Sequence, residues 1–304
     1  MAEDYPRNQL EFERRFSSDA ACREYLASLR WPEGFVCNRC SGRSAWQTKR
    51  GLWRCRDCRY DTSVTAGTVF QDSHLDLMLW FRAIWYITTQ KYGASALGVQ
   101  RMLGIASYKS AWALMHKLRH AMVRPGRQRL SGTVEVDEAY WGGEEKGVKG
   151  RQTMEKALII VAAEENGRGI GRVRMQQIFG HDRGSLHGFI RDSVEPGSTV
   201  RTDGLPAYLG LENYVHRPHV QRKQPADAYL LPRVDRVISL FKRWLMGTHQ
   251  GAVERHYLDY YLDEFTFRFN RRTSTSRGKL FYRLAQQAVQ ADPMTFDQLT
   301  DHNP

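Results

Sequence analysis

The chain has 304 residues, 41% of them hydrophobic and 12% aromatic, which is enough for a buried core and excludes a wholly disordered chain. Lysine and arginine number 45 against 33 acidic residues, and the resulting charge of +12 favours nucleic acid as a partner, with a merely soluble basic protein as the alternative. The N-terminus has no apolar signal segment and the longest apolar run, 77–87, contains Arg82, so we expect a cytoplasmic protein without a membrane span.

Four cysteines follow a predicted helical segment at 1–30, and they form two CxxC pairs: Cys37, Cys40, Cys55 and Cys58. Four thiolates on two tight turns suit a tetrahedral zinc ion, and strands predicted at 44–47 and 52–54 would complete a zinc ribbon. Disulfides are disfavoured in a chain without a secretory signal. Cys22 has no partner nearby and is expected in the core. Arginines and lysines on the ribbon favour contact with DNA, although a ribbon that binds only protein is the alternative.

A helical segment is predicted to follow the ribbon. The apolar helix over 73–91 carries aromatic side chains that we expect in the core. Two helices, 95–104 and 107–120, flank a glycine-containing turn, a pattern typical of a helix-turn-helix, with an ordinary amphipathic hairpin as the alternative. The second would be the recognition helix in a DNA major groove. Of its basic residues Lys109, His116, Lys117, Arg119 and His120, we predict that Lys109, Lys117 and Arg119 contact DNA.

The stretch 133–143, TVEVDEAYWGG, predicts a strand that ends at a pair of glycines. Alternation places Glu135 and Asp137 on the face opposite the two valines. Carboxylates that point inward cost desolvation free energy unless a positive group lies beside them. We therefore expect a basic side chain or a metal ion there, with a solvated edge strand as the alternative.

The segments around this strand predict the fold of the domain that contains it. A basic linker at 123–132 precedes the strand, and a loop is predicted at 144–154. The expected order thereafter is strand 157–163, strand 171–178, helix 183–194, strand 198–203, helix 205–212 and strand 213–219. This is the order of an α/β ribonuclease H-like fold, with a mixed sheet flanked by helices. In that fold the first strand carries Asp137, and Asp203 ends the neighbouring fourth strand.

A helix is predicted over 232–246, PRVDRVISLFKRWLM, with one apolar face. Asp235, Ser239 and Lys242 follow one another at three- and four-residue steps, so they share another face. An exposed acid–base pair is the ordinary interpretation of such a pattern. The order of a strand acid, a strand-end acid and a helix acid with a following lysine favours a catalytic role.

Taken together, the blocks CNRC, CRDC, VEVDEAYWGG, RTDG, ISLFKRW, GTHQGA and YLDEFTFRFNRR cover almost the whole chain. In these blocks the chain resembles the DDE-type transposases of bacterial insertion sequences, in the ISXO2-like group with an N-terminal zinc ribbon. The resemblance implies that Asp137 and Asp203 are the first two catalytic acids and that Asp235 is the third. Two Mg²⁺ or Mn²⁺ ions would be held by these acids, and one structural Zn²⁺ by the four cysteines.

Further expectations follow from the same resemblance. Lys242 and Arg243 would contact DNA, and the partners would be the terminal inverted repeats of the element and its target DNA. A homodimer or higher oligomer on DNA, associated with the nucleoid, is expected. Glutamate is usual at the third site of the broader class, so Asp235, shorter by one methylene, departs from the pattern. Glu254 and Glu264 are rival acids.

Three functions and five segments are consistent with these patterns. The first function is a transposase that cuts and joins DNA, the alternative is a transposase-derived DNA-binding protein with a decayed catalytic core, and a resolvase or repair nuclease is a weaker third. The expected segments are an N-terminal helical segment at 1–30, the zinc ribbon at 31–72, a helix-turn-helix module at 73–125, the catalytic domain at 126–285 and a C-terminal tail at 286–304.

Overall fold

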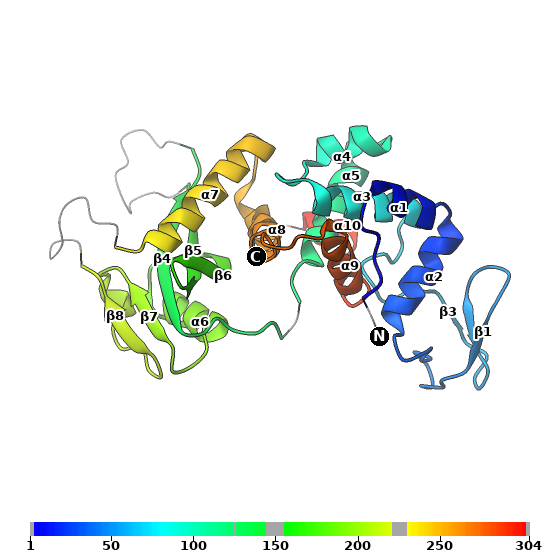
Figure 1. Ribbon diagram of the computed structural model, residues 1–304, viewed down its shortest axis with the longest axis horizontal. Helices are drawn as coiled ribbons and strands as arrows, with labels where there is room; N and C mark the ends of the chain where they lie inside the picture. The colour runs from blue at the N-terminus through cyan, green and yellow to red at the C-terminus, as the bar shows by residue number, and fades with distance from the viewer. Residues whose placement is uncertain (1–2, 125, 144–154, 221–229, 302–304) are drawn as a thin grey trace. The chain divides into compact units, whose positions relative to one another are not determined.

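The computed structural model describes residues 3–124, 126–143, 155–220 and 230–301, and the chain divides into two compact units (Figure 1). Unit 1 comprises Met1–Pro125 and Thr273–Pro304, and unit 2 comprises Gly126–Arg272. The loop predicted at 144–154 lies outside the described residues. Within the described residues no helix is long and apolar enough to cross a membrane.

Unit 1 combines helices with a small sheet. Its helices are α1 (Gln9–Arg15), α2 (Asp19–Arg30), α3 (Leu77–Thr89), α4 (Ala96–Leu103), α5 (Tyr108–His120), α9 (Arg277–Ala288) and α10 (Phe296–Thr300). Its antiparallel sheet has the order β1 (Ala45–Gln47), β2 (Trp53–Cys55) and β3 (Asp61–Thr62). The helices of the front segment and the first two strands were predicted close to these bounds, whereas β3 was not predicted.

The core of unit 1 is a cluster of aromatic rings around Phe281 of α9. This ring is fully buried, and its centroid lies 5.5 Å from Phe12, 5.5 Å from Phe16 and 5.7 Å from Phe81. The prediction that the catalytic domain extends to residue 285 therefore differs from the structure, in which α9 belongs to unit 1. The burial of apolar rings against α3 decides where α9 packs. The expected C-terminal tail at 286–304 likewise contains the end of α9 and α10.

Helices α4 and α5 are joined by a turn whose geometry requires glycine. Gly104 ends α4 with φ +65°, a left-handed conformation that a side chain disfavours, and its N–H donates to the carbonyl of Gln100. Ser95 begins α4 by accepting a hydrogen bond from the N–H of Gly98. The two helices therefore lie where the sequence predicted a helix, a turn and a helix.

Unit 2 is a five-stranded mixed sheet with helices. Its strands are β4 (Thr133–Trp141), β5 (Ala157–Asn166), β6 (Gly169–Ile178), β7 (Thr199–Thr202) and β8 (Val215–Pro218), and its helices are α6 (Arg183–Ser193), the short 3₁₀ helices η2 (Pro206–Tyr208) and η4 (Arg255–Tyr257), α7 (Pro232–His249) and α8 (Leu258–Phe269). The strand order is β6-β5-β4-β7-β8, in which β4, β5 and β6 are antiparallel neighbours and β7 and β8 run parallel to β4. The helix expected over 205–212 is reduced to η2.

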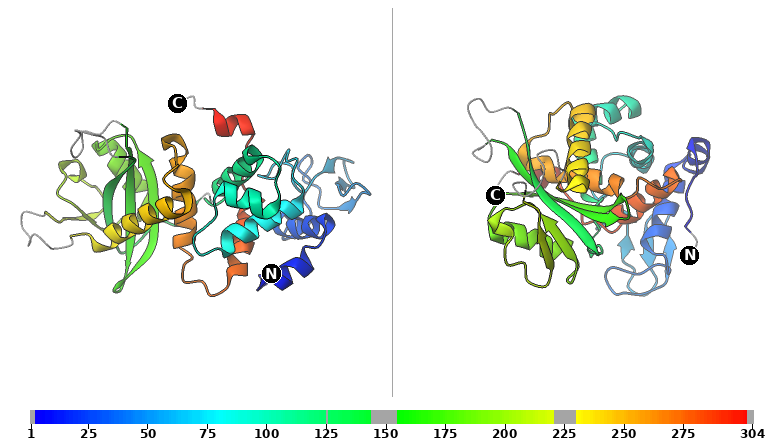
Figure 2. Two further views of the ribbon diagram at one scale, coloured as in Figure 1. Left: turned by 90° about the horizontal axis from the view of Figure 1, so that it is seen from above. Right: turned by 60° about the vertical axis from the view of Figure 1, so that its left-hand side comes forward.

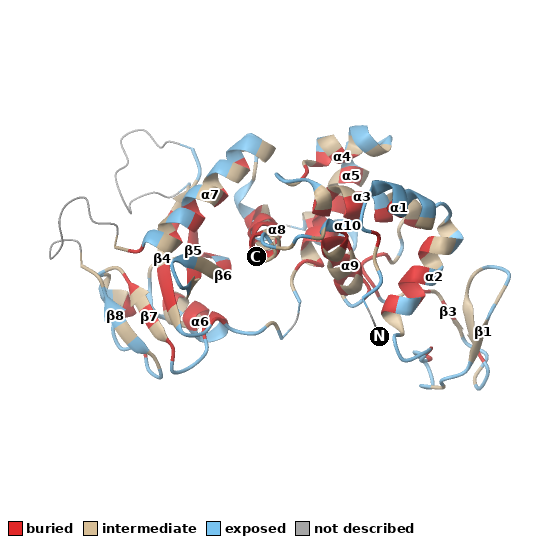
Figure 3. Ribbon diagram, viewed as in Figure 1, coloured by how far each residue is buried: buried red, intermediate tan, exposed pale blue. Residues whose placement is uncertain are grey.

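The two faces of this sheet bury separate hydrophobic clusters, as the alternation along β4 requires. Ala139 and the facing residues of β5 pack with α7 and α8, whereas Val134 and Val136 pack with α6 and η2. Figure 2 shows α7 lying along its face of the sheet, and Figure 3 shows that β5 is largely buried. Gly142 ends β4 with φ +149°, where a Cβ would lie 3.2 Å from the Cα of Lys156.

Candidate active site and metal centres

The four predicted zinc ligands converge in the ribbon. The ligand atoms of Cys37, Cys40, Cys55 and Cys58 all lie within 4.8 Å of one another, and two sulfur–sulfur distances are 3.6 Å. A zinc ion with bonds of about 2.3 Å to four sulfurs sets those sulfurs roughly 3.8 Å apart, so the cluster has the size of a tetrahedral zinc site. All five cysteines are free thiols, and Cys22 is buried in α2 away from the cluster.

Each of the two cysteine pairs lies in a backbone turn of the same kind. The N–H of Ser41 donates to the carbonyl of Cys37, and the N–H of Arg59 donates to the carbonyl of Cys55. Ser41 and Arg59 each have a positive φ near +60°, which closes the turn just after the second cysteine of each pair. The ribbon has few buried apolar residues of its own (Phe35, Cys37 and Cys55), so its residues fit a structural metal ion.

The three predicted catalytic acids come from three elements: β4, the end of β7 and the first turn of α7. The parallel register pairs Glu135 with Arg201, so two residues further on Asp137 is level with Asp203, directly after β7. Neighbouring strands are about 4.8 Å apart, which makes these two acids neighbours across the sheet. Asp235 lies in the first turn of α7, which packs on the same face of β4 as Asp137.

The charges of these acids act on one another. Burial raises the pKa of Asp137 to about 7, and the negative charges of Glu138, Asp203 and Asp235 contribute to the same shift. The pKa of Asp235 is also raised, first by burial and then by the charge of Glu135. The side chain of Asp137 accepts a hydrogen bond from the N–H of Glu138, which lies 2.9 Å from Oδ1. A cation bound among these carboxylates would remove the repulsion.

We expect Asp137→Asn to stabilise the metal-free protein at pH 8. An acid whose folded-state pKa is raised holds its proton more tightly when folded, so folding loses stability as pH rises from about 4 to 7. Removing the charge should recover on the order of 2 kcal/mol at pH 8, after allowance for partial exposure, and less at pH 5. Thermal unfolding at both pH values, without added Mg²⁺, measures the gain.

Glu164→Gln is the matched control with the opposite sign. Although burial alone opposes it, hydrogen bonds from Arg172 and from the N–H of Ser131 hold the pKa of Glu164 near 2. An acid with a lowered pKa stabilises the fold above its unfolded value, and that stability disappears as pH falls toward 2. Glu164→Gln should therefore destabilise unit 2 at pH 8. Loss of stability in Asp137→Asn would contradict the assignment of a strained acid cluster.

Glu135, the other inward acid of β4, has a cationic partner. Its side chain is fully buried and pairs with Arg233, whose Nη1 lies 2.9 Å from Oε1. The expectation that a basic side chain or a metal ion lies beside these acids thus has two outcomes. An arginine lies beside Glu135, whereas Asp137 forms no ion pair within the described residues.

Next to Asp137, Glu138 is part of a polar network that the sequence did not predict. The side chain of Glu138 is only 4% exposed, accepts a hydrogen bond from the hydroxyl of Tyr208, and has Oε2 3.3 Å from Nδ1 of His181. Nε2 of His181 lies 2.7 Å from the hydroxyl of Tyr140. Burial raises the pKa of Tyr208, and the charges of Glu138, Asp137 and Asp203 add to the shift. The adjacency of two acids in VDEAY was the one sequence signal for this network.

Lys242 and Arg243 lie two turns beyond Asp235 on α7, and Arg243 is exposed. Burial lowers the pKa of Lys242, and the positive charge of Lys156 lowers it further. Two ammonium groups that repel each other would both be stabilised by an anion between them. Lys156 is thus a second candidate for a phosphate contact, and no motif in the sequence singled it out.

The predicted DNA contacts on α5 separate into two classes. Lys109 is exposed and Lys117 is partly buried, and both line a cavity of about 350 Å³ with Phe296 of α10. Arg119 is only 1% exposed and His116 is fully buried, so Arg119 is excluded from direct contact in this structure. These two face the apolar side of α5, because position and not residue type decides which face a helical residue occupies.

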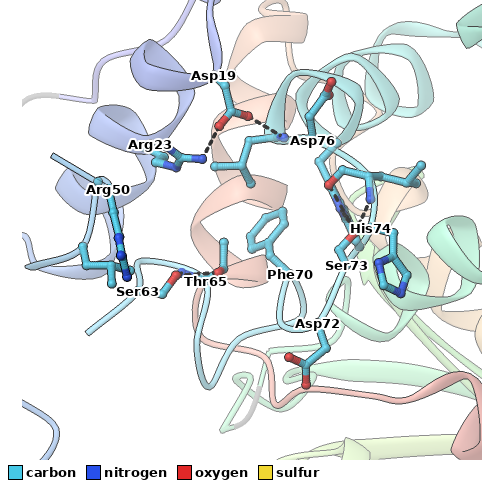
Figure 4. A pocket seen from close by; sticks show the side chains of 15 residues that line it. Asp19, Arg23, Arg50, Ser63, Thr65, Phe70, Asp72, Ser73, His74 and Asp76 are labelled. Atoms are coloured by element: carbon cyan, nitrogen blue, oxygen red, sulfur yellow. Dashed lines mark hydrogen bonds and ion pairs between the residues drawn. The ribbon is translucent and has the colours of Figure 1, made fainter. Parts of the chain in front are cut away.

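A second cavity of unit 1, of about 390 Å³, lies where the ribbon meets α2 and the segment before α3 (Figure 4). Asp19 pairs with Arg23 at 2.6 Å and accepts a hydrogen bond from the N–H of Leu77. Both acids and arginines line it, so the charges offset one another. Its paired side chains indicate a structural contact and not a phosphate site.

The rival acids differ from the three candidates in their surroundings. Glu254 is exposed and lies 3.3 Å from Nε2 of His256. Glu264 is fully buried in α8. Neither is among the charges that shift the pKa of Asp137 most. Among the described residues, the four cysteines are the one group of three or more metal-binding side chains whose ligand atoms already lie together.

Parts of both units match the models of known protein families. Residues 129–270 match the model of the ISXO2-like transposase domain, and residues 17–61 match that of the transposase zinc-ribbon domain. An uncharacterized protein in transposable element ISH50 of Halobacterium salinarum is 27% identical over 282 residues, which cover 84% of this chain and 92% of that protein. The first match contains every strand of unit 2 and the three candidate acids, and the second contains the four cysteines. The chain therefore contains an ISXO2-like transposase domain preceded by a transposase zinc-ribbon domain.

Proposed function

We propose that the protein binds the ends of an insertion sequence and performs metal-dependent DNA cleavage and strand transfer, with Asp137, Asp203 and Asp235 as its catalytic acids. The observation that carries this proposal is the placement of three acids on β4, directly after β7 and in the first turn of α7, where burial raises the pKa of Asp137 and the charges of Asp203 and Asp235 add to the shift. The strand order, in which an antiparallel set of three is extended by two strands parallel to the first, supports a ribonuclease H-like fold.

The residues of this site have distinct roles in the proposed reaction. Two Mg²⁺ or Mn²⁺ ions, which prefer oxygen ligands, would activate a water or a 3′-hydroxyl and neutralise the leaving oxygen. Asp137, central among the acids, would hold both ions, Asp203 one of them, and Asp235 the other, directly or through water. Lys242 would hold a DNA phosphate near the scissile bond. No covalent bond between protein and DNA is needed, so no serine or tyrosine nucleophile is assigned.

A cleavage assay on a labelled element end tests this function. With Mg²⁺ or Mn²⁺ the full-length protein should nick the end and join it to a target duplex, and excess EDTA should stop both steps. Binding of the end without cleavage under any of these conditions would favour a transposase-derived DNA-binding protein. Cleavage without strand transfer would favour a resolvase or repair nuclease. Inverted repeats in the DNA that flanks the gene would supply the substrate.

DNA recognition is proposed to be divided between the units, with the ribbon and α5 recognising the element end and basic side chains of unit 2 holding the backbone. Recognition should be tested on the full-length chain, because a fragment that ends at residue 125 lacks α9 and the central ring of its core. A homodimer or higher oligomer on DNA would bring two element ends together, and binding to DNA would place the protein in the cytoplasm at the nucleoid.

Lys109→Ala is expected to weaken binding of the element end more than Lys117→Ala, because Lys109 is exposed whereas Lys117 is partly buried and close to the charge of Asp72. Each lysine that contacts phosphate releases counterions, so its loss should lower the slope of log affinity against log salt by about one. Titrations at several salt concentrations measure the slope. Lys279→Ala, which removes a lysine paired with Glu3 in the same unit, should leave the slope unchanged. Equal slopes for all three variants would contradict the assignment to α5.

A further inference from the structure

We propose that Glu135 and Arg233 are positioning residues that fix the start of α7 against β4 and thereby hold Asp235 in place beside Asp137. This role depends on the proposed function, since it assigns a purpose to the spacing between two acids of the site. Neither residue is one of the three proposed catalytic acids. From the sequence alone, Glu135 is expected, like Asp137, to lie beside a basic side chain or a metal ion.

Glu135 caps a helix from a neighbouring strand. Its Oε2 accepts hydrogen bonds from the backbone N–H groups of Arg233, at 2.7 Å, and Val234, at 3.0 Å. The first N–H groups of a helix have no partner within it, and they carry the positive end of the helix dipole. The residue before α7 is Leu231, which has no side chain able to cap the helix. A fully buried carboxylate on β4 takes that role instead.

The hydrogen bonds that Glu135 accepts connect Asp137 on β4 to Asp235 on α7 through only a few residues. Glu135 lies two residues before Asp137 on the same face of β4, and Asp235 directly follows Val234 on α7. An α-helix turns by about 100° per residue, so a slip of α7 by one residue would point Asp235 away from the sheet. Asp235 is therefore held at one rotation of the helix by hydrogen bonds made one and two residues earlier.

Arg233 holds the same junction from the other side. Its Nη1 pairs with Oε1 of Glu135 at 2.9 Å, and its Nη2 pairs with Oε1 of Glu165 at 2.5 Å. It also donates to the carbonyls of Gly167, at 3.0 Å, and Gly169, at 3.2 Å. One guanidinium thus connects β4, the end of β5 and the start of β6 to the first turn of α7. The planar fork of arginine makes these contacts together, which the single ammonium of lysine cannot do.

Glu135→Gln in the zinc-loaded full-length chain tests the proposal, because the amide keeps an oxygen acceptor but loses the charge and one acceptor. We expect at least tenfold faster hydrogen exchange at the amides of Arg233 and Val234. We also expect roughly 10- to 100-fold weaker Mn²⁺ binding, the usual effect of removing a group that orients a metal ligand. Titration of Mn²⁺ without DNA measures the affinity, so the readout does not require activity.

A double-mutant cycle separates positioning from general structural support. If Glu135 acts through Asp235, Glu135→Gln should weaken Mn²⁺ binding by less than about twofold in a chain that already carries Asp235→Asn. Glu164→Gln, which breaks the 2.6 Å pair between Glu164 and Arg172 elsewhere on β5 and β6, is the control. It should lower stability and leave Mn²⁺ affinity as in the wild type.

The outcomes are distinguishable. Wild-type Mn²⁺ affinity in Glu135→Gln, together with faster exchange at the two amides, would overturn the positioning role and leave the acids as proposed. Unchanged Mn²⁺ affinity in Asp137→Asn and in Asp235→Asn would instead overturn the proposed function. If Glu135→Gln does not fold, Arg233→Lys decides the matter, since it keeps the backbone cap and removes only the fork. Arg233→Lys should weaken Mn²⁺ binding severalfold, and unchanged affinity would reject the proposal.

Discussion

Asp137→Asn and Asp203→Asn are each expected to abolish cleavage of the element end and strand transfer while binding of the end persists. Both side chains lie where β4 and β7 run level, and Asp137 is the acid on which the charges of Asp203 and Asp235 converge. Loss of metal ligation forfeits several kcal/mol of transition-state stabilisation, which corresponds to a fall of at least about a thousandfold in rate. A labelled-end cleavage assay, with binding measured in parallel, reports both effects.

Graded variants in the same assay examine the third acid. Asp235→Asn should reduce cleavage severely, and Asp235→Glu should retain some activity because it keeps the carboxylate. Lys242→Ala should be milder and should act mainly on DNA positioning. Glu254→Gln is the matched control, since Glu254 is an exposed acid beside His256 outside the cluster. Full activity in Asp235→Ala would move the third role to another acid, with Glu254 the first to be tested.

Cys40→Ser is expected to unfold the ribbon and to leave unit 2 folded. The ribbon buries few apolar residues, so metal binding must supply most of its folding free energy, and a serine hydroxyl is a poor zinc ligand. Wild-type protein should contain about one zinc per chain, as the single cluster of four thiols requires. Elemental analysis, with circular dichroism or NMR of the ribbon, measures both quantities.

Cys22→Ser provides the control for zinc, because this cysteine is fully buried in α2 and lies outside the cluster. It should keep the wild-type zinc content even if it lowers stability slightly. Unit 2 has its own hydrophobic clusters and should unfold at its usual temperature in Cys40→Ser. A metal-free ribbon that is fully folded would contradict a structural role for zinc.

Local sequence determined the elements and the residue types of both candidate sites. The two CxxC pairs carry their turn geometry within four residues each, so the zinc cluster could be predicted from spacing alone. Alternation along β4 and the helical period of α7 determined which faces carry Asp137 and Asp235, because side-chain direction follows from strand and helix geometry. The order of strands and helices then predicted that Asp137 and Asp203 are neighbours, and the register of β4 with β7 agrees.

Only the tertiary structure decided how charges and helices are paired across long stretches of chain. Glu135 and Asp137 look alike in sequence, yet Glu135 meets Arg233, 98 residues away, whereas Asp137 meets other acids. Tyr208 reaches Glu138 across 70 residues, and α9 joins the front unit although it follows α8 in the chain. Arg119 is buried because one face of α5 packs against its neighbours. Such contacts depend on burial of apolar surface and satisfaction of buried charges among distant segments, which no local period encodes.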